Sequence, residues 1–252
     1  MHRFERRWVR NGMIALPVVA ALAGCGVVGG QDAMIQRGQI VGGATKQVTD
    51  VQPVPGFLPQ PGLLSPGGPG RAALVYFAPD ANLPSYRNVM LDRMVISAGR
   101  DSALANVPRS QQEQLVNRYQ NKLYKALSQR CRMVRSPTPG TIRLRFALTD
   151  AQQSDRAVST VATYAPYVST AASAASLLFN KGVGYFAGGA SAEGYATDAI
   201  SGKLLWEAVD RRGGTGALVQ NTLDTWLDVN LAMDDWAETI ARRVQELGMC
   251  ST

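Results

Sequence analysis

Residues 141–150, TIRLRFALTD, decide the fold class of this chain. Large apolar side chains fall on every second position from residue 142 to residue 148, and two of the positions between them hold Arg143 and Arg145. A period of two is typical of a β-strand that buries one face and leaves the other in water. The stretch therefore predicts a half-buried strand with a core on one side.

Further strands are predicted where Val, Ile, Leu and aromatic residues gather between Pro, Gly and polar turn signals. They cover residues 73–77, 89–96, 189–197 and 203–209. The last two are joined by residues 198–202, DAISG, and so predict a β-hairpin.

Two helices complete the predicted domain. Ser110 to Glu113 has the spacing of a capping box, which starts a helix whose apolar stripe recurs every four residues at Leu115, Tyr119, Leu123 and Leu127. Residues 233–247 form the second, with Asp234 and Asp235 suited to its N-terminus. The order β-β-α-β-β-β-α predicts one globular domain over residues 71–252, of the α+β or α/β class: a mixed sheet of about five strands with two main helices packed on it, as a two-layer sandwich.

The first 24 residues have the features of a signal peptide. Four arginines precede an apolar run, residues 13–22, that is too short for a stable membrane span. The run ends in Leu22, Ala23, Gly24 and Cys25, which match the bacterial lipobox. We expect Cys25 to carry a diacylglyceryl group and to anchor the chain in a lipid bilayer. The alternative is an ordinary secretory signal with an incidental cysteine.

The residue after the anchor and the stretch beyond it predict a location and a tether. Gly26, in place of an aspartate, favours the outer membrane over the inner one, with the domain facing the periplasm. Residues 26–70 contain 11 glycines and 6 prolines, which predict a flexible tether over residues 25–70. Phe57, Leu58, Leu63 and Leu64 interrupt the tether and are expected to dock on the domain.

The only histidine, His2, lies in the expected leader. The mature chain would then lack Ser-His-Asp and Cys-His chemistry and every His-ligated metal site. We therefore expect no catalytic residues, no metal, no cofactor and no enzymatic activity. Nucleic acid is not an expected partner of an exported lipoprotein.

Two cysteines remain after Cys25, namely Cys131 and Cys250, each just beyond a predicted helix. In an oxidising periplasm such an isolated pair favours a disulfide. The alternative is two unpaired buried thiols.

A basic stretch is a candidate anion-binding surface. No acidic residue lies between Glu113 and Asp150, and the stretch contains Arg118, Lys122, Lys125, Arg143 and Arg145. Clustered positive charge attracts lipid phosphates or cell-wall carboxylates. The alternative is a solvated helix face whose charges are balanced by Asp210, Asp224 and Asp228.

Residues 157–180 contain no charged side chain, and together with the glycines up to residue 189 they form a low-charge insertion. Its small residues at four-residue spacing suit close helix approach, so self-association or membrane insertion are candidates beside simple packing.

The late hairpin carries Glu193, Asp198, Glu207 and Asp210. Such carboxylates suit glycoside chemistry or a solvated edge. A further alternative is that Glu193 and Glu207 pair with Arg143 and Arg145 across the sheet.

Several motifs, in matching order over residues 55–247, resemble domain of unknown function 3313. They are PGFL at 55–58, FAPDA at 77–81, YRNVMLD at 86–92, PGTIRLR at 139–145 with LTD at 148–150, and AVDRR at 208–212. The resemblance implies a bacterial lipoprotein and supplies no catalytic residues.

The leading hypothesis is an anchored, non-enzymatic module that binds an envelope protein or peptidoglycan. A homo-oligomeric secretion or channel accessory is the alternative, and a wall-modifying enzyme the second alternative.

Overall fold

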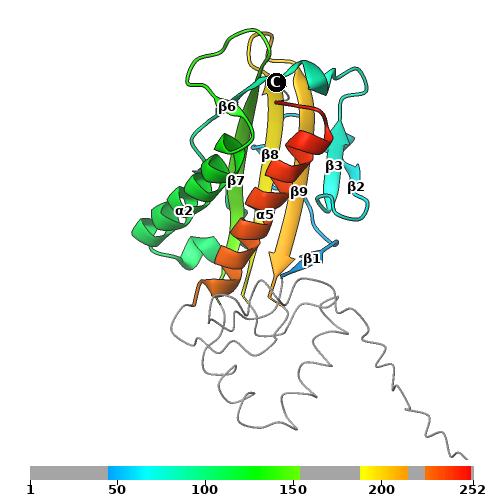
Figure 1. Cartoon of the computed structure of the whole chain (residues 1–252). Helices are drawn as coiled ribbons and strands as arrows, with labels where there is room; N and C mark the ends of the chain where they lie inside the picture. The colour runs from blue at the N-terminus through cyan, green and yellow to red at the C-terminus, as the bar shows by residue number, and fades with distance from the viewer. Residues whose placement is uncertain (1–44, 154–187, 215–224, 251–252) are drawn as a thin grey trace, which may run out of the picture. The chain divides into compact units, whose positions relative to one another are not determined.

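A computed structural model describes residues 45–153, 188–214 and 225–250. The leader, Cys25, Asp224 and nearly all of the low-charge insertion lie outside these residues. Within them, the chain forms one mixed β-sheet with two long helices on one face (Figure 1). The predicted class, with helices packed on a mixed sheet, is confirmed.

The centre of the sheet is the long antiparallel trio β7 (Thr141–Gln152), β8 (Gly189–Asp198) and β9 (Leu204–Gly213). The predicted hairpin is the pair β8–β9. Beyond β9 lie β3 (Leu74–Phe77) and β2 (Ser65–Pro66), and beyond β7 lie β4 (Asn88–Leu91) and β6 (Arg132–Met133). The last two strands are β1 (Lys46–Val48), which pairs with β9, and β5 (Val95–Ile96), which pairs with β7.

The sheet has nine strands, so the predicted count of about five was too low. Strands of two or three residues, such as β2 and β6, are too short to show a period of two in sequence. The predicted strand 89–96 is two strands, β4 and β5, because the chain leaves β7 at Asp92 and returns at Val95. Short 3-10 helices at Pro61–Leu63, Leu83–Ser85 and Ala103–Asn106 fill the connections.

Helices α2 (Arg109–Ser128) and α5 (Leu227–Glu246) lie side by side on the same face of the sheet (Figure 1). They run parallel, because Arg118 in the middle of α2 contacts Asn230 near the start of α5, and Arg130 just beyond the end of α2 contacts Gln245 near the end of α5. Helix α5 begins roughly two turns before Asp234, so that residue and Asp235 lie in the helix and not at its N-terminus.

The main core lies between these helices and the sheet. Leu115, Tyr119, Leu123 and Leu127 of α2 are all at most 3% exposed, as their spacing predicted. Tyr119 packs at 5.5 Å from the Trp236 ring and at 6.5 Å from the Phe146 ring, measured between ring centroids. The alternation along β7 thus turns Phe146 toward the helices and Arg145 toward the opposite face.

The opposite face is covered by residues 49–64, which join β1 to β2 and are called the strap below. Leu58 of the strap is 7% exposed and packs with Tyr195 and Val209, and the Phe57 ring meets the Tyr195 ring edge to face. Docking of Phe57 and Leu58 on the domain is therefore confirmed, whereas Leu63 is 44% exposed. The expected tether over residues 25–70 was too long, because β1 and the strap belong to the folded domain from residue 45 onward.

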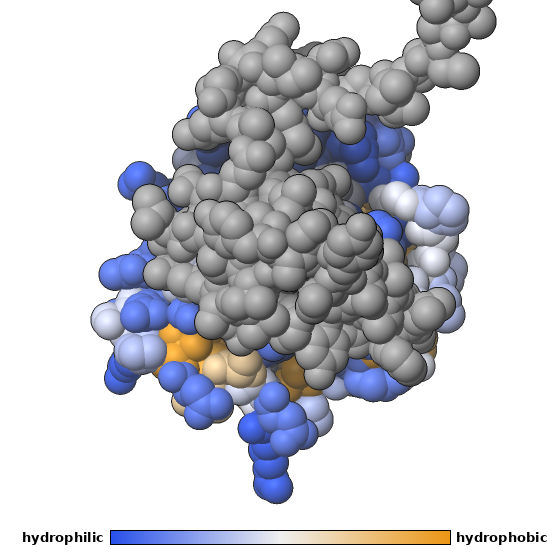
Figure 2. All heavy atoms as spheres, turned by 90° about the horizontal axis from the view of Figure 1, so that it is seen from below, coloured by the Kyte–Doolittle hydropathy of each residue, from blue (hydrophilic) through white to orange (hydrophobic). Residues whose placement is uncertain are grey.

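In the view from below the orientation of Figure 1, the visible part of the described surface is mainly hydrophilic, with hydrophobic side chains in small separate areas (Figure 2). Among the described residues, none of the helices has the length and apolar character that a membrane span requires.

Candidate functional site

A mainly apolar groove lies between helix α5 and the edge of the sheet at β3. Its volume is about 130 Å³, and it is open to solvent on one side. Val75 and Phe77 of β3 and Trp206 of β9 line the sheet side, and Ile240 and Leu247 of α5 line the helix side. Helix α5 lies over β8 and β9 and leaves part of β3 uncovered, so these side chains border an opening and not a closed core.

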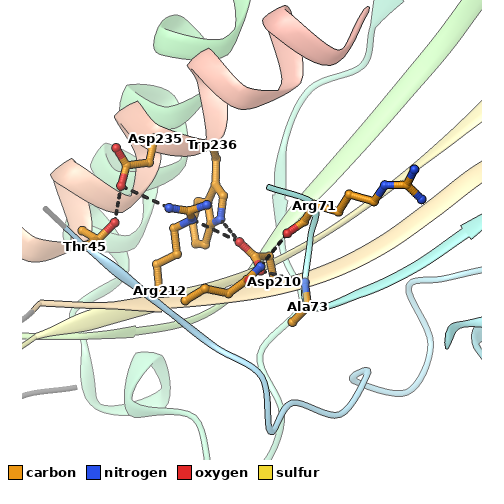
Figure 3. Close-up of polar contacts among 8 residues, drawn as sticks. Thr45, Arg71, Ala73, Asp210, Arg212, Asp235 and Trp236 are labelled. Atoms are coloured by element: carbon orange, nitrogen blue, oxygen red, sulfur yellow. Dashed lines mark hydrogen bonds and ion pairs between the residues drawn. The ribbon is translucent and has the colours of Figure 1, made fainter. Parts of the chain in front are cut away.

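One end of the groove is closed by a polar network centred on Asp210, which is 7% exposed (Figure 3). Its Oδ1 accepts hydrogen bonds from Gln47 Nε2 at 2.5 Å and from the backbone N–H of Ala73 at 2.9 Å. Its Oδ2 accepts from Trp236 Nε1 at 2.7 Å and from Arg212 Nε at 3.2 Å. Four donors occupy the four acceptor positions of the carboxylate, so Asp210 holds the fold and has no free acceptor for a ligand.

The same network connects three separate parts of the chain. Arg212 also pairs with Asp235 of α5 at 3.3 Å, and Asp235 accepts a hydrogen bond from Thr45 just before β1. Asp210 and Arg212 come from the AVDRR motif, in which alternate residues point to the helix side of β9. The network therefore fixes the start of the domain, strand β9 and helix α5 against one another.

A second polar site lies on the opposite face, under the strap. Glu193 of β8 is 1% exposed and Glu207 of β9 is fully buried. The backbone N–H of Val54 donates to Glu193 Oε1 at 2.5 Å, and that of Gln60 donates to Glu207 Oε1 at 2.7 Å. In the part of the chain that the structure describes, the Oε2 atom of each carboxylate has no hydrogen-bond partner.

The sequence did not predict this buried pair. It placed Glu193 and Glu207 either on a solvated edge or against Arg143 and Arg145, and both expectations were wrong. Glu193 stands in ASAEGYAT, where it is the only charged residue and most of its neighbours are small, and this low charge is the signal that could have indicated a buried strand. Burial raises the pKa of Glu193 to about 7 and also raises the pKa of Glu207, while the strap N–H groups oppose both shifts.

Replacing Glu193 with glutamine is expected to flatten the pH dependence of stability. Between about pH 4.5 and 7 the folded protein keeps a proton on Glu193 that the unfolded chain releases. The free energy of unfolding therefore falls as the pH rises through this window and stays low above it. We expect E193Q to match the parent protein near pH 4.5 and to exceed its stability at pH 8 by up to about 3 kcal/mol. Urea unfolding at a series of pH values measures this.

The matched control is Glu113→Gln, which removes an exposed carboxylate on α2. That variant should retain the parent pH profile. A profile for E193Q that falls as steeply as the parent profile between pH 5 and 7 would show that Glu193 ionises normally in the fold, because the contribution of Glu207 is common to both proteins.

The five residues of the expected anion-binding surface do not form one surface. Arg118 donates to Asn230 at 2.8 Å, Lys122 pairs with Asp234, and Lys125 is exposed, all on the outer side of the helix layer. Arg143 and Arg145 extend from the other face of the sheet, because they alternate with the residues that meet the helices.

Asp92 is the partner of both sheet arginines. Arg143 Nε and Arg145 Nε contact its carboxylate at 2.9 and 2.7 Å, and Arg145 also donates to the Tyr195 hydroxyl. Burial favours the neutral acid, but these hydrogen bonds outweigh it and lower the pKa of Asp92. The balancing acids are thus Asp92 and Asp234, and the expectation that Asp210 and Asp228 have this role was wrong.

The remaining predicted groups are distributed through the fold. Cys131 and Cys250 form a disulfide with their Cα atoms 5.0 Å apart. Asp198 closes the β8–β9 turn by accepting from Ser201 and from the Tyr86 hydroxyl. The four late carboxylates therefore lie on two faces and in a turn, and not around one cleft. Among the residues described, no three His, Cys, Asp or Glu side chains gather as a metal-binding group.

An open mixed sheet with two parallel helices on one face and a strap on the other defines an α+β domain. The chain belongs to the family described as protein of unknown function DUF3313, whose model matches residues 56–240. The resemblance carried by its motifs is thereby confirmed.

Two solved structures are similar to part of this chain, and both are of the PelC dodecamer from Paraburkholderia phytofirmans. One shares 9% sequence identity with a TM-score of 0.35 and covers 66% of this chain and 96% of the PelC chain. The other, a point variant, shares 11% identity with a TM-score of 0.34 and covers 66% and 95%. No curated protein matches the sequence.

Proposed function

We propose that this protein is a periplasmic lipoprotein of the outer membrane that binds another component of the cell envelope without enzymatic activity. The groove beside α5 is the observation that carries the binding role. Ligand sites are typically concave, mostly apolar and preformed, with a few polar groups at their edge. The groove has these properties, and the Asp210 network at one end holds its two sides in place.

The anchoring part of the proposal depends on the lipobox that ends in Cys25. Residues 26–44 lie between this cysteine and the first residue of the described domain. Such a length spans at most about 65 Å when fully extended, so an acylated Cys25 would keep Thr45, the first described residue of the domain, within that distance of the membrane surface. This geometry suits a module that binds a lipid, a membrane protein or peptidoglycan close to the bilayer.

The polar groups around the groove support a binding role and not a reaction. Asp210 is saturated by four donors, and the late carboxylates do not meet in one cleft. A purified protein that released fragments from peptidoglycan would favour the wall-modifying enzyme instead. A homo-oligomeric secretion accessory is favoured by the charge-free run 157–180, and a ring-sized native mass of the gently extracted lipidated protein would support it.

Replacing Cys25 with alanine is expected to move the protein from the membrane pellet to the soluble periplasmic fraction. Each buried acyl methylene contributes about 0.8 kcal/mol to membrane binding, and the variant loses all of them. Fractionation followed by immunoblotting measures the distribution.

Gly26→Asp is the matched control, because it keeps the acylation site and changes only the sorting residue. This variant should stay in the membrane pellet and move from the outer to the inner membrane. A Cys25→Ala protein that remained in the membrane fraction would overturn the anchoring proposal.

A further inference from the structure

We infer that the groove receives the apolar end of an anionic amphiphile, an acyl chain that ends in a carboxylate or phosphate group. This inference rests on the proposed binding role and names the class of ligand.

The floor of the groove is hollow because its strands carry small residues there. Ala192, Gly194 and Ala196 of β8 and Ala208 of β9 all line it. These positions face the helix layer, where ordinary side chains would fill the space. Gly194 is needed for close packing, since a Cβ atom there would lie 2.5 Å from two ring carbons of Phe146. The Phe146 ring therefore lies against the strand backbone and leaves room beside it.

The size of the groove limits how much of a ligand it encloses. A volume of about 130 Å³ is close to that of an apolar protein cavity of about 150 Å³ that binds benzene. An apolar segment of roughly six carbons fits this space, and a longer chain would extend through the open side. Phe77, Trp206 and Ile240 offer large apolar surfaces to that segment.

Charge selects the other end of the ligand. Three arginines, Arg71, Arg212 and Arg243, line the groove, against one acid, Asp210. Arg212 is bound to Asp210 and Asp235, so the excess positive charge belongs to Arg71 and Arg243.

These two arginines are available to an anion. Within the described ranges, no acidic side chain pairs with Arg71, and its side chain points away from the Asp210 network (Figure 3). Arg243 is half-buried and contacts the exposed Glu246 at 2.6 Å, and an ion pair that solvent reaches is weak enough for a ligand anion to compete with Glu246. An anionic head group between the β2–β3 turn and α5 would therefore meet cations, while its tail enters the groove.

The test uses the tryptophans of the groove as reporters. Trp206 and Trp236 line it, whereas Trp226 lies before α5 and Trp8 lies in the leader. Full-length protein in lipid nanodiscs is titrated with 8-bromooctanoate, whose terminal bromine quenches a tryptophan only on close approach. We expect saturable quenching that is displaced by octanoate and by octyl phosphate, and at least about tenfold less well by octanol.

Thr239→Phe fills the groove from a half-buried position of α5, and Asn121→Phe places the same ring on the exposed surface of α2. Quenching should be lost in T239F and kept in N121F, with both variants checked for folding by circular dichroism. Arg71→Gln and Arg243→Gln should each weaken octanoate binding about tenfold and leave octanol unchanged. Displacement at a lower concentration of octyl phosphate than of octanoate would identify a phosphate head group, and the reverse a carboxylate.

Quenching that rises linearly and persists in T239F would show bilayer partitioning and overturn the inference. Loss of a native oligomer in T239F, without displacement by any amphiphile, would assign the groove to a second copy of the chain. If the probe fails while the protein still retains an envelope component at stoichiometric ratio, only the ligand class is wrong. If both fail, the binding role itself is contradicted.

Discussion

Replacing Cys131 and Cys250 with serine is expected to lower the free energy of unfolding by about 4–5 kcal/mol. The disulfide closes a loop of 119 residues, and release of so long a loop returns a large conformational entropy to the unfolded chain. The bond also joins the segments that follow the parallel helices α2 and α5. Urea unfolding of the oxidised parent protein and of the double variant measures the difference.

Reduction of the parent protein is the matched control, because it breaks the same bond without changing the sequence otherwise. Its unfolding midpoint should coincide with that of the double serine variant. We also expect weaker binding of 8-bromooctanoate, since Leu247 and Met249 line the groove directly before Cys250. A reduced protein as stable as the oxidised one would show that the helix ends are held by packing alone.

Replacing Asp210 with alanine is expected to destabilise the fold by about 3–5 kcal/mol. The change leaves the indole N–H of Trp236 and the backbone N–H of Ala73 without their acceptor, and it removes one of the two carboxylates, Asp210 and Asp235, that pair with the Arg212 guanidinium. Unsatisfied buried donors and an unbalanced buried charge are among the few mechanisms that give losses of this size. Denaturant unfolding and the emission of Trp236 report the loss.

Asp234→Ala is the control on helix α5. Asp234 is exposed and pairs with Lys122 at the surface, so its removal should cost less than about 1 kcal/mol. The loss of stability in Asp210→Asn should lie between those of D210A and D234A. The amide oxygen keeps one acceptor, but the amide NH2 group replaces the other carboxylate oxygen and faces groups that also donate. An alanine variant no less stable than D234A would show that the network contributes little to the fold.

The candidate sites differ in how far sequence could predict them. Cys131 and Cys250 are the only cysteines after Cys25, so counting was sufficient to propose their pairing. The prediction of an anion-binding surface was wrong because it grouped Arg118 and Arg143 by their closeness in sequence. Arg118 lies on helix α2 and Arg143 on strand β7, and their side chains extend from different sides of the domain. Asp92 lies beside Arg143 because β4 pairs with β7 in parallel. The two segments are about 50 residues apart in the sequence, so no local pattern indicated this contact.

The local elements could be predicted from the sequence: the period of two in β7, the four-residue stripe of α2, the β8–β9 hairpin and the family motifs. Each depends on neighbours a few residues apart, which a single chain displays directly. Three features became visible only in the folded domain: the strap covers the back of the sheet, Glu193 and Glu207 are buried beneath it, and a groove stays open beside α5. These features arise where distant segments meet, and their register and separation depend on the packing of the whole domain, which no local pattern records.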